Sequence, residues 1–126
     1  MPLVKINLVN NKTAEFKNKL GDLIHESIVE TANVPVLDKF QIINECKIEN
    51  FIFDKTYQNM NRTDDLIIIE IILNKGRTTE VKKNLYNAIS TKIENKLKIS
   101  KDDILISLQE VEKENWSFGK GLATYI

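Results

Sequence analysis

The sequence predicts an α+β fold in which two β-α-β units form one four-stranded sheet with both helices on one face. Two observations carry this prediction. A shift of about 65 residues brings two halves of the chain into register without a gap. Each half then reads as a strand, an amphipathic helix and a second strand. We expect a single domain over residues 1–126, with its two halves at about 2–46 and 65–112.

The repeat covers strand positions and helix positions alike. Matching positions have the same character: Val4, Ile6 and Leu8 fall on Ile69, Ile71 and Leu73; Leu20, Ile24 and Ile28 fall on Leu85, Ile89 and Ile93; Lys17, Asp38 and Glu45 fall on Lys82, Asp103 and Glu110. A gapless match across two types of element indicates an internal duplication.

In the first half, partial alternation predicts a strand near 2–9. Thr13 is a suitable N-cap for a helix at about 14–32, in which apolar residues recur at four-residue spacing. Pro35 follows this helix, and the residue before a proline disfavours helical backbone. A second strand is expected at roughly 38–46.

The second half repeats this plan. We predict a strand near 65–73, an N-cap at Thr78, a helix near 79–97 and a closing strand near 103–112.

The two remaining segments are less regular. Residues 47–64 are expected to form a polar loop, with or without a short hairpin, and 113–126 a loop followed by a short strand.

A strand–helix–strand unit crosses over right-handed and makes its two strands parallel. Both helices therefore cover one face of the predicted sheet. The opposite face carries Leu3, Lys5, Ile68 and Ile72. Because no helix remains to bury its apolar residues, we expect the chain to self-associate.

The composition excludes several classes of protein. Eighteen basic residues balance eighteen acidic ones, which argues against a nucleic-acid binder. The single cysteine, Cys46, cannot form an internal disulfide. The longest apolar run, residues 66–73, is interrupted by Glu70 and is too short to cross a membrane. With no signal peptide visible, we expect a cytoplasmic protein without membrane contact.

Five motifs occur in order along the chain: Met1-Pro2-Leu3; Val34-Pro35 followed by Asp38-Lys39-Phe40-Gln41; Arg62-Thr63-Asp64; Arg77-Thr78; and Trp116-Ser117-Phe118-Gly119. With the β-α-β duplication, they resemble the tautomerase superfamily of N-terminal proline enzymes, and most closely its malonate semialdehyde decarboxylase-like branch. The resemblance covers most of the chain. It implies a tautomerase (MIF-like) fold, a homotrimer, a small anionic substrate, and neither a metal nor an organic cofactor.

The resemblance also implies roles for individual residues. Removal of Met1 would expose Pro2 as the catalytic amine, and Asp38 would handle water or a proton. Arg77 matches one of two substrate-binding arginines, whereas Lys75 stands at the other position. A lysine keeps the charge but not the planar fork that grips a carboxylate.

Two aromatic residues, Trp116 and Phe118, match residues that wall the pocket in this family. Core or interface packing is the plainer interpretation of both. Asp38 also suits a turn after Pro35, and Arg77 a solvated charge in a turn.

A free α-amino group titrates near pH 8, roughly, and burial or nearby cations lower that pKa. Pro2 would then be a general base for a tautomerase or isomerase that moves a proton in small anionic keto/enol acids. A protonated Pro2 would instead favour a decarboxylase or hydratase of malonate-semialdehyde type. The sequence leaves both open, together with a non-catalytic trimeric scaffold or binding module.

Overall fold

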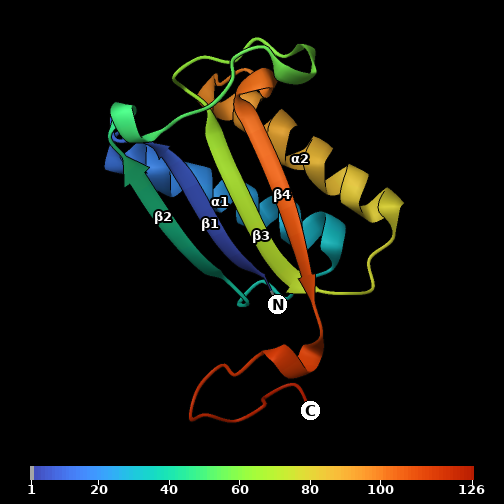
Figure 1. The fold of residues 1–126 in the computed structure, drawn as a ribbon. Helices are drawn as coiled ribbons and strands as arrows, with labels where there is room; N and C mark the ends of the chain where they lie inside the picture. Colours follow the sequence, from blue (N-terminus) through green and yellow to red (C-terminus); the bar gives the residue numbers. More distant parts are fainter. Residues whose placement is uncertain (1) are drawn as a thin grey trace.

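The computed structural model describes residues 2–126, so expectations about Met1 lie outside the described residues. The regular elements, in chain order, are β1 (Leu3–Val9), α1 (Ala14–Ala32), β2 (Phe40–Cys46), β3 (Ile67–Asn74), α2 (Thr79–Leu97) and β4 (Ile104–Val111) (Figure 1). Short 3-10 helices lie at Ile48–Asn50, Tyr57–Asn59, Lys101–Asp103 and Lys113–Asn115.

The strands form one four-stranded sheet in the order β2-β1-β3-β4. Each β-α-β unit contributes a parallel pair, β1 with β2 and β3 with β4, whereas the central pair, β1 and β3, is antiparallel. Both helices lie across the same face of the sheet (Figure 1). The predicted α+β fold class is therefore confirmed.

The two helices have the predicted bounds because their caps are local features of the sequence. Thr13 Oγ1 accepts a hydrogen bond of 3.0 Å from the backbone N–H of Phe16, and Thr78 Oγ1 accepts one of 3.2 Å from Val81. These bonds satisfy N–H groups that have no partner inside the helix. Both helices end at a residue in left-handed conformation, Asn33 for α1 and Lys98 for α2.

The core lies between the helices and the sheet. Its fully buried residues come from the central strands and from the apolar stripes of α1 and α2: Val4, Ile6, Leu8, Leu20, Ile24, Ile28, Ile69, Ile71, Leu73, Leu85, Ile89 and Ile93. The opposite face keeps apolar residues in solvent, and Phe40 and Ile42 on β2 are 49% and 47% exposed.

The internal repeat extends to ion pairs. Lys17 Nζ lies 2.7 Å from Glu45 Oε1 and joins α1 to β2. At the matching positions, Lys82 Nζ lies 2.8 Å from Glu110 Oε1 and joins α2 to β4. The two halves therefore share a helix-to-strand ion pair as well as an apolar pattern.

The structure decides the open question of a hairpin in the first irregular segment and contradicts the short strand expected in the second. Residues 47–66 contain two short 3-10 helices and no hairpin, and Phe51 is buried against Val9 and Leu66. After Val111 the described chain contains no strand. Gly119, Lys120 and Gly121 have positive φ angles of 154°, 60° and 68°, which turn the chain away from extended backbone.

Among residues 2–126, neither helix is long and apolar enough to span a bilayer.

Candidate active site

The candidate site lies at one end of the strands. At this edge of the sheet β1 and β2 begin, and β3 and β4 end. The antiparallel pairing of β1 with β3 brings these ends together. The C-terminal segment, residues 112–126, passes beneath this edge (Figure 1). Residues from the start, middle and end of the chain therefore meet there.

A pocket of about 620 Å³ opens at this edge. Its lining comes from the end of α1 and the segment after it, the turn between β3 and α2, and the C-terminal segment: Ala32, Asn33, Val34, Pro35, Asp38, Asn74, Lys75, Gly76, Arg77, Lys113, Phe118 and Tyr125. Four residues singled out from the sequence, Asp38, Lys75, Arg77 and Phe118, thus line one pocket.

Two other predicted site residues, Pro2 and Trp116, are not among the lining residues. Pro2 is buried and directly precedes β1, whose first residue, Leu3, pairs with Phe40 and Ile72. Pro2 therefore lies at the same edge of the sheet as the pocket.

Arg77 is half-buried and ordered by backbone carbonyls. Its Nη1 donates to the carbonyl oxygen of Asn74 at 3.0 Å, and its Nη2 donates to that of Ala32 at 3.1 Å. Its Nε is buried and has no hydrogen-bond partner among the described residues. The guanidinium thus joins the last turn of α1 to the segment after β3, which differs from the solvated turn charge considered from the sequence.

Lys75 lies at the outer rim of the pocket. Its Nζ is 2.8 Å from Glu112 Oε1, and the two side chains are 61% and 59% exposed. The hydrogen bond that Lys75 donates to Glu112 and the charge of that carboxylate raise the pKa of Lys75 above its ordinary value. The Lys75 side chain is therefore a cation at neutral pH and is held only by a solvent-exposed partner.

Asp38 lies on the segment between α1 and β2. Its backbone N–H donates to the carbonyl oxygen of Pro35 at 3.0 Å, which closes a turn. Its carboxylate acts electrostatically on Tyr125, across the pocket from the segment that carries Asp38.

Aromatic rings of the C-terminal segment form one wall. The Phe118 ring is stacked on Phe40 with centroids 6.2 Å apart, and lies 5.7 Å from Trp116 and 5.0 Å from Tyr125. Trp116 Nε1 donates to Asn74 Oδ1 at 2.7 Å. Trp116 therefore contacts two lining residues from outside the pocket.

Sequence reasoning missed Asn74 and Tyr125. Burial and the negative charge of Asp38 raise the pKa of Tyr125, and a hydrogen bond with the Asn74 side chain and the charge of Arg77 oppose this effect. Asn74, a buried polar residue at the end of an apolar strand, was the available signal. Tyr125 lies in a segment without periodicity, and the sequence offered no signal for it.

The chemistry of the pocket is that of an anion site. Arg77 and Lys75 supply positive charge beside the N-terminus of α2, Lys113 adds a third cation from the C-terminal segment, and Asp38 supplies a carboxylate. Among residues 2–126, no three His, Cys, Asp or Glu side chains gather closely enough to hold a metal ion.

Two family models, both described as tautomerase enzyme, match the chain, one over residues 2–58 and the other over residues 38–119. The chain belongs to the tautomerase family. A Bacillus subtilis (strain 168) protein named "Probable tautomerase YusQ" is 40% identical over 126 residues, which cover 100% of this chain and 99% of the relative. "Probable tautomerase YrdN" of the same strain is 30% identical over 126 residues, with 100% and 97% covered.

Solved structures agree with this membership. A malonate semialdehyde decarboxylase is 26% identical with a TM-score of 0.92, covering 98% of this chain and 95% of the other. The FG41 malonate semialdehyde decarboxylase inhibited by 3-bromopropiolate is 28% identical with a TM-score of 0.91, covering 98% and 93%. This tautomerase is therefore an enzyme of the malonate semialdehyde decarboxylase-like branch of its superfamily, as the sequence motifs predicted.

Proposed function

We propose that this tautomerase moves a proton in small anionic keto/enol acids, with the amine of Pro2 as general base. Membership of the family supports the reaction type. The observation that carries the proposal is the position of Pro2, buried at the sheet edge where a pocket with three cations and a carboxylate opens. The role requires that Met1 is removed, because an amide nitrogen is not basic.

The proton transfer is written on the enol acid. Pro2 N takes the proton of the enol O–H, the electrons of that bond form the C=O, and the C=C electrons take this proton back from the protonated Pro2 at carbon. The keto acid results, and no atom is gained or lost. Burial disfavours the charged form of an amine and so makes the free Pro2 a base near neutral pH.

The substrate carboxylate would be held at the side of the pocket formed by Lys75 and Arg77. Lys75 can leave its exposed partner Glu112, whereas Arg77 is fixed by the carbonyls of Asn74 and Ala32. Arg77 then contributes a fixed charge, and Lys75 a mobile one. Phe118, supported from outside the pocket by Trp116, would close the apolar side of the substrate.

A second candidate activity is decarboxylation of a β-carbonyl acid, or hydration of a related acid. The likeness to two malonate semialdehyde decarboxylase structures, with TM-scores of 0.92 and 0.91, favours it. A protonated Pro2 would polarise the carbonyl, the bond from the α-carbon to the carboxylate would break, CO₂ would leave, and the carbon would take up a proton. Asp38 would orient water in the hydratase.

The proposed assembly is a homotrimer. The exposed Phe40 and Ile42 on the helix-free face support self-association, and fused 4-OT, whose structures are described as trimers, has the same fold at 19% identity with a TM-score of 0.79. Light scattering should give three times the chain mass of 14.5 kDa. A monomer at micromolar concentration would exclude the trimer.

The test of the reaction uses two substrates. Phenylpyruvate, followed by ultraviolet absorbance, reports keto–enol conversion, and malonate semialdehyde reports CO₂ release. Keto–enol conversion of phenylpyruvate without CO₂ release from malonate semialdehyde supports the tautomerase. CO₂ release that is faster than keto–enol conversion supports the decarboxylase. Activity on neither substrate, with a folded protein freed of Met1, would reject both reactions for these acids.

An independent probe for the amine is 3-bromopropiolate, the inhibitor named for the FG41 enzyme. Peptide mapping by mass spectrometry should find the adduct on Pro2. An adduct on another residue alone would argue against a nucleophilic Pro2.

A further inference from the structure

The segment that carries Asp38 is exposed to solvent. Val36 and Leu37 are 69% and 95% exposed, and the segment belongs to neither helix nor strand. Its internal hydrogen bonds are local, from Asp38 N to the carbonyl of Pro35 and from Lys39 N to that of Leu37. Such a segment needs contacts with a rigid element if the Asp38 carboxylate is to keep a fixed position.

Helix α1 supplies these contacts at three points on both sides of Asp38. His25 Nε2 lies 2.7 Å from the carbonyl oxygen of Val36, and Lys39 Nζ lies 2.8 Å from Asp22 Oδ1. Farther on, the Gln41 side chain donates through Nε2 to the carbonyl oxygen of Gly21 at 2.8 Å.

The three helix residues, at positions 21, 22 and 25, lie within about one turn of each other. Segment 36–41 therefore runs along α1 and is fastened before and after Asp38. A Cβ on Gly21 would lie 2.5 Å from the Gln41 amide oxygen, so a larger residue at position 21 would displace the Gln41 amide.

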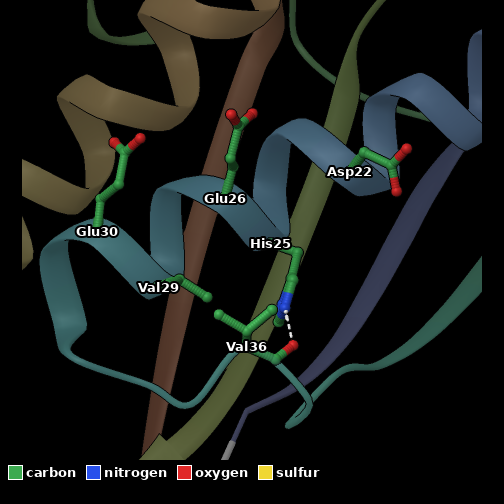
Figure 2. A pocket seen from close by; sticks show the side chains of 6 residues that line it. All are labelled: Asp22, His25, Glu26, Val29, Glu30 and Val36. Atoms are coloured by element: carbon green, nitrogen blue, oxygen red, sulfur yellow. Dashed lines mark hydrogen bonds between the residues drawn. The ribbon is translucent and has the colours of Figure 1, made fainter.

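The His25 contact differs from the other two because it holds the backbone of the Asp38 segment itself, whereas the other two hold the side chains of Lys39 and Gln41. Figure 2 shows the imidazole turned from α1 toward Val36, while Glu26 and Glu30 point away from it. A carbonyl oxygen only accepts, so Nε2 carries the hydrogen. Neutral imidazole in the Nε2–H form and imidazolium both donate there, so the bond does not depend on which form is present.

We propose that His25 is a positioning residue that fixes the backbone before Asp38 and so sets the position of the Asp38 carboxylate in the pocket. The inference rests on the role of Asp38 in the proposed function. Loss of the bond leaves the fold intact, because the buried core of the molecule does not include His25. It lets the exposed turn move relative to the pocket.

The test compares His25→Leu with His25→Gln, whose side-chain amide can still donate to Val36. For His25→Leu we expect kcat to fall about fivefold to tenfold, the order of one net hydrogen bond, with KM within about twofold. His25→Gln should keep at least about half of the activity. Equal losses in the two variants would overturn the inference.

A double-mutant cycle separates positioning of Asp38 from a general effect on the pocket. If His25 acts through Asp38, His25→Leu should cost less than about twofold when introduced into Asp38→Asn. An unchanged fivefold to tenfold cost in that background would contradict the inference.

A matched pair of lysines provides the control. Lys39→Met removes the α1 contact beside Asp38, and Lys17→Met removes the α1–β2 ion pair with Glu45 at the far end of β2. We expect lower activity only in Lys39→Met. Equal activity of the two variants would contradict the inference that contacts with α1 hold the Asp38 segment in place.

Hydrogen exchange of the Asp38 amide tests the tether without any substrate. Its exchange should accelerate about fivefold to tenfold in His25→Leu and stay within about twofold in His25→Gln. Unchanged exchange in His25→Leu would overturn the inference. If Pro2→Ala retained full activity the proposed function would fail instead, and the exchange rates would still decide whether His25 holds the segment.

Discussion

The indole Nε1 of Trp116 donates a hydrogen bond of 2.7 Å to Oδ1 of Asn74, which ties the C-terminal segment to the end of β3. Asn74 is only 7% exposed, so its amide depends on protein partners. The Asn74 side chain also bonds to Tyr125. One buried amide thus joins two of the three aromatic residues of the segment, Trp116 and Tyr125, to the sheet.

Replacing Trp116 by Phe should remove this bond and keep an aromatic ring in place. The free energy of unfolding should fall by about 1 kcal/mol, the usual size of one hydrogen bond. Because the pocket wall loosens, kcat/KM should also fall by about fivefold. Urea unfolding followed by circular dichroism, with steady-state kinetics, measures both. Unchanged KM and kcat would show that the wall does not need this bond.

Tyr125 should ionise at higher pH than an ordinary tyrosine, because burial and the charge of Asp38 raise its pKa above 10.0. Folding therefore favours its protonated form. This contribution to stability is complete below the pKa of the unfolded chain and is lost as pH rises through the folded pKa.

Absorbance titration near 295 nm should show one tyrosine that ionises at higher pH than the other two in the wild type, and this step should be missing in Tyr125→Phe. If the high-pH ionisation persisted in Tyr125→Phe, it would belong to Tyr57 or Tyr86, and the prediction for Tyr125 would be wrong.

Asp38 and Asp103 occupy matching positions in the two halves but should have opposite phenotypes. Asp103 is 2% exposed, and its carboxylate accepts hydrogen bonds from Thr63 N at 2.7 Å and Thr63 Oγ1 at 2.6 Å. Asp103→Ala should lower the free energy of unfolding by about 2–3 kcal/mol, because it removes both hydrogen bonds of a buried carboxylate to Thr63.

The Asp38→Asn variant should keep its melting temperature within about 2 °C, as expected for surface changes, and lose activity. Thermal melts and kinetics on both variants test this contrast. If Asp38→Asn lowered the melting temperature more than Asp103→Ala, the predicted contrast between the two aspartates would be wrong.

Arg77 and Lys75 should also differ. The Arg77 guanidinium bridges two carbonyls, and a lysine cannot reproduce this fork. Arg77→Lys should therefore lower stability by about 1–2 kcal/mol and raise KM. Lys75→Met should raise KM without a measurable change in melting temperature, because its ion pair is exposed. A stable Arg77→Lys variant with normal KM would contradict the bridging role.

The sequence predicted the fold well because its signals were local and repeated. The caps Thr13 and Thr78 and the four-residue apolar spacing define both helices within their own segments. The strand ends differed by at most two residues, and strand ends depend on partners that sequence patterns do not show.

The candidate site was predicted only in part. Asp38, Arg77 and Phe118 belong to the sequence motifs, Lys75 was singled out by the family resemblance, and all four line the pocket. Asn74 and Tyr125 join it through contacts between β3 and a C-terminal segment without periodicity, and such tertiary contacts leave no local pattern.

The most direct test of the central claim combines the intact mass of the purified protein with keto–enol kinetics of wild type and Pro2→Ala. We predict that the wild-type mass corresponds to a chain without Met1, and that kcat/KM falls by at least about a hundredfold in Pro2→Ala, as for loss of a general base. A retained Met1 in active protein, or a Pro2→Ala variant as active as wild type, would contradict the role of Pro2 as the catalytic amine.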